Sequence, residues 1–179
     1  MPQTITEALA EIKTIGKRIE KKRAGIMPFL ARQDGVKDPH DKDGGSTQFI
    51  ENERQSIADL SKRVIALRRG IQRANDVTEI TVGELTMTIS DWLTWRREVA
   101  PGQKAFLGQL AAQVAGARQQ AQKMGAQVAA AGAATQPQDF IININEKELA
   151  AQIDTLEEIL GTLDGQLSLK NATVMIDEA

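Results

Sequence analysis

Apolar residues that recur at alternating steps of three and four positions run through four long segments of this 179-residue chain, and this repeat constrains the fold more than any other feature. In the first segment the repeat is carried by Ile5, Leu9, Ile12, Ile19, Ile26 and Leu30. The spacing places an apolar stripe along one face of an α-helix, as in coiled coils. It predicts a helix over residues 5–31, which begins with a capping box of Thr4 and Glu7.

The same spacing predicts three more long helices, over residues 47–74, 90–132 and 146–170. Their stripes are formed by Ile50, Ile57, Leu60, Val64, Leu67, Ile71 and Ala74 in the second helix, by Leu107, Leu110, Val114, Ala117, Ala121, Met124 and Val128 in the third, and by Leu149, Ile153, Leu156, Leu160, Leu163 and Leu167 in the fourth. Proline has no amide hydrogen to donate, so Pro101 predicts a kink or a break in the third helix.

Alternating polar and apolar residues predict short strands between and beside these helices. Four such segments occur, at residues 78–82, 85–89, 139–144 and 172–176, and the first two flank Gly83 as a hairpin. The predicted fold is therefore mainly α. We expect a single helical domain over residues 1–179, built as a long-helix bundle or antiparallel coiled coil, with a few short β-strands that form a small sheet at one end.

The residues that the chain lacks limit its chemistry. It contains no cysteine and one histidine, His40. A thiolate nucleophile, a disulfide framework and a cysteine-based metal site are therefore excluded, and a Ser-His-Asp triad or a multi-histidine metal site has almost no residues to draw on. We expect no enzymatic activity, no catalytic residue, no cofactor and no metal.

The segment over residues 33–45 contains four aspartates, which raises the question of a calcium site. A calcium-binding loop needs oxygen ligands at positions one, three and five, glycine at position six and glutamate at position twelve. Aligning Gly44 with the sixth position puts Pro39 at the first and Ile50 at the twelfth. The pattern fails, and the segment is interpreted as a solvated loop between two helices.

The overall charge of the chain gives little attraction to polyanions. Twenty-two basic and 24 acidic side chains leave a net charge of −2, so nucleic acid is not an expected partner. No run of about 18 apolar residues occurs, so we expect neither a membrane span nor a signal peptide.

Charge is unevenly distributed along the chain. Residues 1–32 hold seven basic and three acidic side chains, and residues 47–75 hold six and three. Residues 139–179 hold two basic and nine acidic side chains. We therefore expect the acidic last helix to lie beside the two basic helices and to neutralise them, although exposed ion pairs contribute only roughly 0–1 kcal/mol each.

Two groups of residues are candidates for an interface. Trp92, Trp95 and Arg96 form the first group, because Trp and Arg are favoured at interface hot spots. The alternative for Trp92 is that it packs inside the fold, where the hairpin meets the bundle. The second group consists of apolar residues on the Ala- and Gln-rich third helix: Leu107, Leu110, Val114, Met124 and Val128.

Several segments, in their order along the chain, resemble a known family. They are the helix that contains Glu11–Ile19, the loop at Asp38-Pro39, the helix end Ile71–Asn75, and the segments Val82–Thr86, Ile144–Leu149 and Leu169–Ala172. This series resembles the small helical proteins labelled septicolysin-like, in the versions encoded by tailed phages. The resemblance implies no catalytic residue, and the family label implies a pore-forming toxin.

Together these observations lead us to expect a non-enzymatic, self-associating structural protein. The resemblance implies a virion-associated protein of a tailed phage, capsid-decorating or tail-accessory, with copies of itself and other capsid or tail proteins as partners. Its location would be the virion if it is phage-encoded, and otherwise the cytoplasm. Two alternatives stay open: a septicolysin-like membrane-active protein, and a nucleic-acid or regulatory binding module.

Overall fold

The computed structural model describes residues 2–130 and 141–177, without the side chains of 127–130. The long helices are α1 (Ile5–Ile26), α2 (Gly45–Val77), α4 (Ala100–Ala130) and α5 (Glu146–Thr173), and a shorter α3 spans Ile89–Thr94. The strands are β1 (Gln3–Thr4), β2 (Glu79–Val82), β3 (Leu85–Thr88) and β4 (Met175–Ile176). The predicted fold class, mainly α with a few short strands, is confirmed.

The described strands form two separate two-stranded sheets, β1 with β4 and β2 with β3, where the sequence predicts one. The chain divides into two compact units. Unit 1 comprises Met1–Glu79 and Leu167–Ala179, and unit 2 comprises Ile80–Gln166. Each unit has buried apolar residues of its own, such as Leu67 in unit 1 and Trp92 in unit 2.

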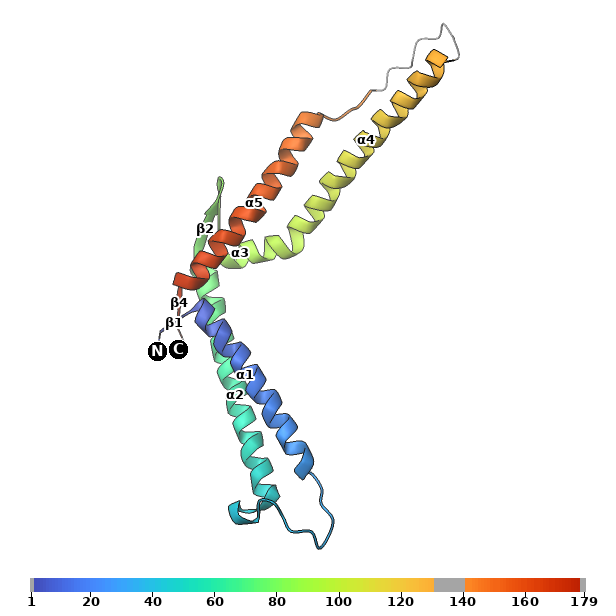
Figure 1. The fold of residues 1–179 in the computed structure, drawn as a ribbon. Coiled ribbons are helices and arrows are strands. Elements are labelled where there is room, and N and C mark those ends of the chain that lie inside the picture. The colour runs from blue at the N-terminus through green and yellow to red at the C-terminus, as the bar shows by residue number, and fades with distance from the viewer. Residues whose placement is uncertain (1, 131–140, 178–179) are drawn as a thin grey trace. The chain divides into compact units, whose positions relative to one another are not determined.

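The core of unit 1 lies between α1 and α2, which run antiparallel and side by side (Figure 1). Ile5, Ala8, Ile15 and Ile19 of α1 are buried in one cluster with Leu67, Ile71 and Ala74 of α2. The buried face of α1 thus includes Ala8 and Ile15, which are not in the predicted stripe, whereas the predicted stripe residue Leu9 is 39% exposed. Two ion pairs join the helices: Lys22 Nζ lies 2.9 Å from Glu53 Oε1, and Arg63 Nε lies 2.8 Å from Glu11 Oε1. The two basic helices are therefore partly neutralised by each other.

β1 and β4 bring the two ends of the chain together in unit 1. The strands are antiparallel, with Gln3 opposite Ile176 and Thr4 opposite Met175. The segment that includes β4 passes α2 at Gly70, where a Cβ atom would lie 2.9 Å from the carbonyl oxygen of Asp177. The absence of a side chain at Gly70 is therefore what allows this close approach.

Gly70→Ala is expected to destabilise unit 1. The new methyl group would push the C-terminal segment away from α2 at a cost of about 1–3 kcal/mol, against a gain of at most about 1 kcal/mol from the higher helix propensity of alanine. Gly16→Ala in α1 is the matched control, because nothing outside the local helix lies within 4 Å of its Cβ position. Urea unfolding measures both variants. If Gly70→Ala is as stable as Gly16→Ala, the close approach does not constrain the fold.

The loop between α1 and α2 is organised around Asp38. Its carboxylate accepts hydrogen bonds from Ser46 Oγ (2.6 Å), Ser46 N (3.0 Å) and His40 N (2.9 Å). These bonds, that of the Ser46 hydroxyl first, lower the pKa of Asp38 to about 2. The His40 ring stacks on Phe49 with centroids 4.1 Å apart and meets Phe29 edge-on. The predicted loop is therefore an ordered turn, and hydrogen bonds to the Asp38 carboxylate hold its backbone in place.

The lowered pKa of Asp38 sets a pH dependence for unit 1. Its carboxylate stabilises the fold above the unfolded-state pKa of about 3.9, and this stabilisation is lost as the pH falls through about 2. Asp38→Ala should therefore lower the melting temperature at neutral pH, and the difference from the wild type should shrink between about pH 4 and about pH 2. Asp41→Ala, in the same loop, is the control. Equal melting temperatures of the two variants at neutral pH would contradict the anchoring role.

Unit 2 begins with the hairpin of β2 and β3, which turns at Gly83 with a φ of 59°. Thr88 then caps α3, because its hydroxyl accepts a hydrogen bond from Asp91 N (3.1 Å). Trp92 in α3 is fully buried, and its Nε1 donates to the carbonyl oxygen of Ile80 in β2 (2.9 Å). This buried bond fixes the hairpin on α3.

A π-helical segment, Trp95–Val99, joins α3 to α4 directly before Pro101. The Ala100 amide there donates to the carbonyl of Trp95, five residues back. Pro101 cannot donate to Arg97 in the usual α-helical pattern, and the wider turn before it takes up the change of register while the helix continues. The predicted interruption thus has the form of a π segment, and Figure 1 shows the helix bending between α3 and α4.

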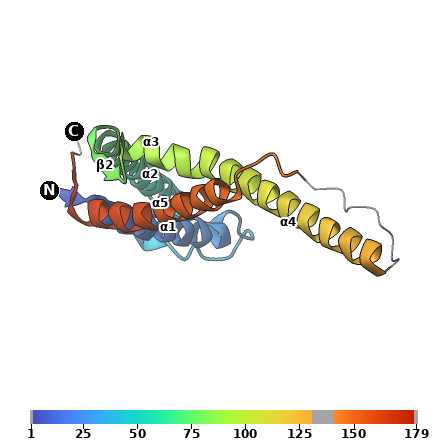
Figure 2. The same cartoon turned by 90° about the horizontal axis from the view of Figure 1, so that it is seen from above.

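α4 and α5 run antiparallel in unit 2. Two ion pairs mark their register, Lys104–Glu157 (3.1 Å) and Arg118–Glu146, and Arg96 of the preceding π segment pairs with Asp164 of α5 (2.7 Å). The sequence predicts that α5 neutralises α1 and α2. This is wrong for Asp164, Glu157 and Glu146, because their basic partners belong to unit 2, in the part of the chain after the β2–β3 hairpin. Because α5 begins at the level of Arg118, the last part of α4 continues beyond it, as Figure 2 shows.

Other element boundaries differ from the predictions. α1 ends at Ile26, and Met27–Phe29 form a 3-10 turn, because Pro28 removes an amide donor. α5 continues to Thr173, which shortens the predicted strand 172–176 to Met175–Ile176. Of the predicted strand 139–144, residues 141–144 form no strand, since no described strand pairs with them. Residues 139–140, and the end of the predicted helix at 131–132, lie outside the described residues.

Candidate functional site

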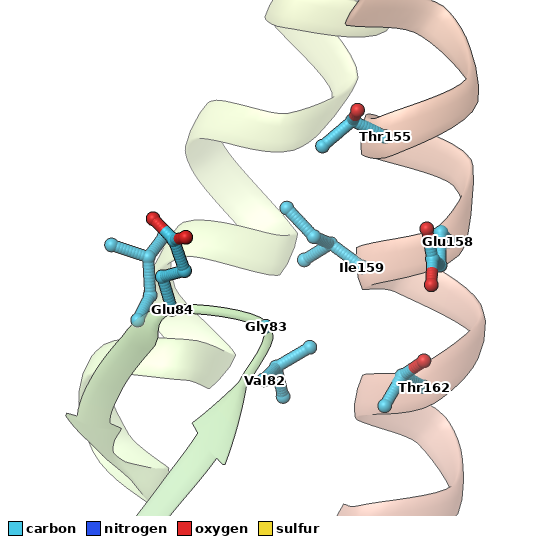
Figure 3. Close-up of a pocket in the computed structure, with 8 residues that line it drawn as sticks. Val82, Gly83, Glu84, Thr155, Glu158, Ile159 and Thr162 are labelled. Carbon is cyan, nitrogen blue, oxygen red and sulfur yellow. The ribbon is translucent and has the colours of Figure 1, made fainter. Parts of the chain in front are cut away.

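An apolar groove runs along α5 in unit 2, and we call it the α5 groove. It consists of two adjoining cavities of about 600 and 350 Å³, which share Leu85, Thr155 and Ile159. The larger cavity lies between α4 and α5, and the smaller one lies between the β2–β3 turn and α5 (Figure 3). These volumes are within the range of about 300–1,000 Å³ that is typical of ligand pockets.

The floor of the groove is one face of α5. It is formed by Glu148, Ala151, Gln152, Thr155, Ile159 and Thr162. Their spacing of three, four or seven positions places these residues on the same side of the helix. Figure 3 shows Thr155, Ile159 and Thr162 along α5, with Ile159 directed toward the hairpin turn. From the first to the last of the floor residues the helix rises about 21 Å.

Exposed apolar side chains form the walls of the groove. Phe106 of α4 is 59% exposed, and Leu85 of β3 is 52% exposed. Leu107 and Trp95, both half-buried, continue the wall, and the Trp95 ring meets Trp92 edge-on with centroids 5.5 Å apart. Complete burial of a leucine or phenylalanine side chain contributes about 1.5–3 kcal/mol. A surface that covers these walls would therefore bind with a substantial hydrophobic gain.

The charged residues that line the α5 groove are all acidic. They are Glu84 in the β2–β3 turn and Glu148 and Glu158 on α5, and all three are exposed. Glu146 and Glu157, which form the ion pairs with α4, lie on a different face of the helix. The groove therefore suits a partner that is apolar at its centre and basic at its edges.

The α5 groove is suited to bind a partner mainly through the burial of apolar surface. Its lining is mostly apolar, with a few polar side chains such as Gln103 and Gln152. Within residues 2–130 and 141–177, no group of three or more His, Asp or Glu side chains is placed to hold a metal ion. Over the same ranges, every helix is too short or too polar to cross a lipid bilayer.

The first group of predicted interface residues is found in three settings. Trp92 is buried, and its indole nitrogen donates a hydrogen bond to the carbonyl oxygen of Ile80. It is therefore a core residue, and the prediction of an exposed anchor is wrong for it. Trp95 lines the α5 groove. Arg96 is partly exposed, and Asp164 Oδ1 lies 2.7 Å from its guanidinium group. The structure therefore brings only Trp95 of this group to the groove.

The second group is spread along α4. Leu107 lines the α5 groove, and Val114 lines a separate cavity of about 230 Å³ between α4 and α5. Leu110 is half-buried, and Met124 is 45% exposed in the part of α4 beyond the start of α5. The side chain of Val128 lies outside the described residues.

Phe106, Leu85 and the three glutamates of the groove were missed by the sequence analysis. Phe106 directly precedes the stripe residue Leu107, so it falls outside the three-four repeat. The composition gives one signal that could have identified it. Aromatic residues make up only 3% of the chain, so a phenylalanine next to the predicted stripe of a helix is a candidate for an exposed apolar side chain.

Comparison with family models and with curated proteins gives no match. A crystal structure of a functionally unknown conserved protein from Corynebacterium diphtheriae is similar to this chain, with a TM-score of 0.52 and 18% sequence identity. The match covers 99% of this chain and 100% of that one. At this identity the likeness shows a shared fold and carries no statement about function.

Proposed function

We propose that the chain is a non-enzymatic, self-associating structural subunit whose copies meet through the α5 groove. The observation that carries this proposal is the groove itself, in which the wall residues Phe106 and Leu85 are more than half exposed. Exposed apolar side chains that are gathered in a groove with polar residues at its rim are typical of interaction sites. A second surface that covers the groove would gain burial free energy that the single chain does not use.

The layout of the groove supports this role. Stable interfaces have an apolar centre, rich in aromatic residues, within a polar rim. Phe106 and Trp95 supply the aromatic part of such a centre, and Glu84, Glu148 and Glu158 supply charged edges. In unit 1 the helices α1 and α2 bury apolar residues against each other, and unit 2 carries the groove that we propose as the attachment surface.

The resemblance to septicolysin-like proteins of tailed phages supports a finer proposal, that the subunit belongs to a virion as a capsid-decorating or tail-accessory protein. Its partners then include other capsid or tail proteins. Mass spectrometry of virions purified from a phage that encodes the chain tests this role. The protein should copurify with the particles in a constant ratio to the capsid protein. Its absence from them would contradict the virion role and leave self-association untouched.

Light scattering after size exclusion tests self-association. At micromolar concentration we expect the wild type to have a mass above the 19.5 kDa of one chain. Phe106→Ser removes an exposed apolar side chain from the groove wall and should raise the dissociation constant about tenfold, which corresponds to about 1.4 kcal/mol. Val77→Ser is the matched control, because Val77 is 78% exposed and lies outside the groove. A monomeric wild type, or equal effects of the two substitutions, would contradict the proposal.

A further inference from the structure

We infer that the α5 groove of one copy receives the outer face of α2 from a second copy. This inference rests on the proposed self-association and names the surface that fills the groove. The outer face of α2 is formed by Ala58, Lys62, Ile65, Arg68, Arg69 and Gln72. It presents an exposed apolar residue among basic ones, which is the complement of an apolar groove with acidic edges.

The outer face of α2 is the side opposite its seam with α1. Its residues are three, four or seven positions from Ile65, so they share one side of the helix. The stripe residues Leu67, Ile71 and Ala74 are buried in the core of unit 1. Ile65 is 53% exposed. An apolar side chain therefore stands at the centre of a face that the core of unit 1 does not use.

Three basic side chains surround Ile65. Arg68 and Arg69 are exposed, and in the part of the chain that the structure describes neither takes part in an ion pair. Lys62 contacts Asp59 on its own helix at 3.2 Å, an exposed pair that contributes little. The two guanidinium groups are therefore available to carboxylates of a partner, which they can bind with two parallel hydrogen bonds.

The α5 groove supplies carboxylates in matching number. Glu84, Glu148 and Glu158 are exposed at its edges, and among residues 2–130 and 141–177 none of them has an ion-pair partner. Charge pairs at the rim of an interface favour the correct partner and speed its association more than they add affinity. In this contact the burial of Ile65 and Phe106 supplies most of the affinity, and the charges select the face of α2.

The two surfaces also agree in length. Ala58 to Gln72 and Glu148 to Thr162 each cover 14 helical steps, or about 21 Å. Ile65 is at the midpoint of the first segment. Thr155, which belongs to both cavities of the groove, is at the midpoint of the second. A helix laid along the groove therefore places Ile65 near Thr155, where the two cavities adjoin.

The contact joins two different surfaces, one from each copy. After two copies have docked, the pair still has one free groove and one free α2 face. Association of this kind continues copy by copy, and it stops only where the geometry closes a ring. A structural subunit built on this contact forms filaments or rings without a second protein.

Charge reversal of each surface in the full chain tests the inference. Arg68→Glu with Arg69→Glu makes both surfaces acidic, and Glu148→Lys with Glu158→Lys makes both basic. Each double variant alone should show a dissociation constant raised about tenfold or more, at an unchanged melting temperature, because all four side chains are exposed. An equimolar mixture of the two should associate again, since each surface then meets the opposite charge on the other variant.

The matched control is Lys13→Glu with Lys17→Glu, which reverses two exposed charges on α1 and should leave association unchanged. If both double variants associate as the wild type does, or if their mixture stays monomeric, the inference is overturned while self-association stands. If only the groove variant loses association, a surface other than α2 fills the groove, and the inference is again overturned. A monomeric wild type would overturn the proposed function together with it.

Discussion

Each long helix of this chain carries an apolar stripe, and a stripe in contact with water is unfavourable until another surface covers it. In unit 1 the stripes of α1 and α2 cover most of each other: Ile5 and Leu67 are 1% and 0% exposed, whereas Leu9 is 39% exposed. In unit 2 the cover is partial. Leu156 and Leu163 of α5 are buried, whereas Phe106, which lies next to the stripe of α4, is 59% exposed. The difference between these two helix pairs underlies the proposed role of the protein.

Local features of unit 2 account for the uncovered surface. The π segment Trp95–Val99 bends the chain before Pro101, and the β2–β3 turn stands beside α5. Cavities of about 100, 230 and 600 Å³ separate the side chains of α4 and α5, so their stripes do not close on each other as those of unit 1 do. Exposed ion pairs lie at three spaced points along α5. Leu149 and Leu156 of α5 are nevertheless buried, so this part of the chain combines buried apolar residues with cavities between them.

The local features of this fold were predictable from the sequence, and the long-range ones were not. The three-four repeat of apolar residues is a local property from which the four long helices follow, and the hairpin around Gly83 follows from the equally local alternation of polar and apolar residues. β1 has two residues and depends on pairing with β4 at the other end of the chain, so no local pattern marks it, whereas β4 lies within the predicted strand 172–176. The partners of the acidic α5 depend on which segment folds beside it. For the same reason the groove could not be predicted: Phe106 and Glu148 lie off the stripes, and only the folded hairpin and helix pair make them neighbours.

Hydroxyl-radical footprinting of the wild-type chain tests the central claim most directly, because it reports the solvent access of single side chains in solution. The claim is that the α5 groove is covered in the assembled protein. We expect the oxidation rates of Phe106 and Leu85 to fall as the protein concentration rises, while the rate of Val77, exposed and outside the groove, stays constant. Unchanged oxidation rates of Phe106 and Leu85 in a sample that contains assembled protein would contradict the claim.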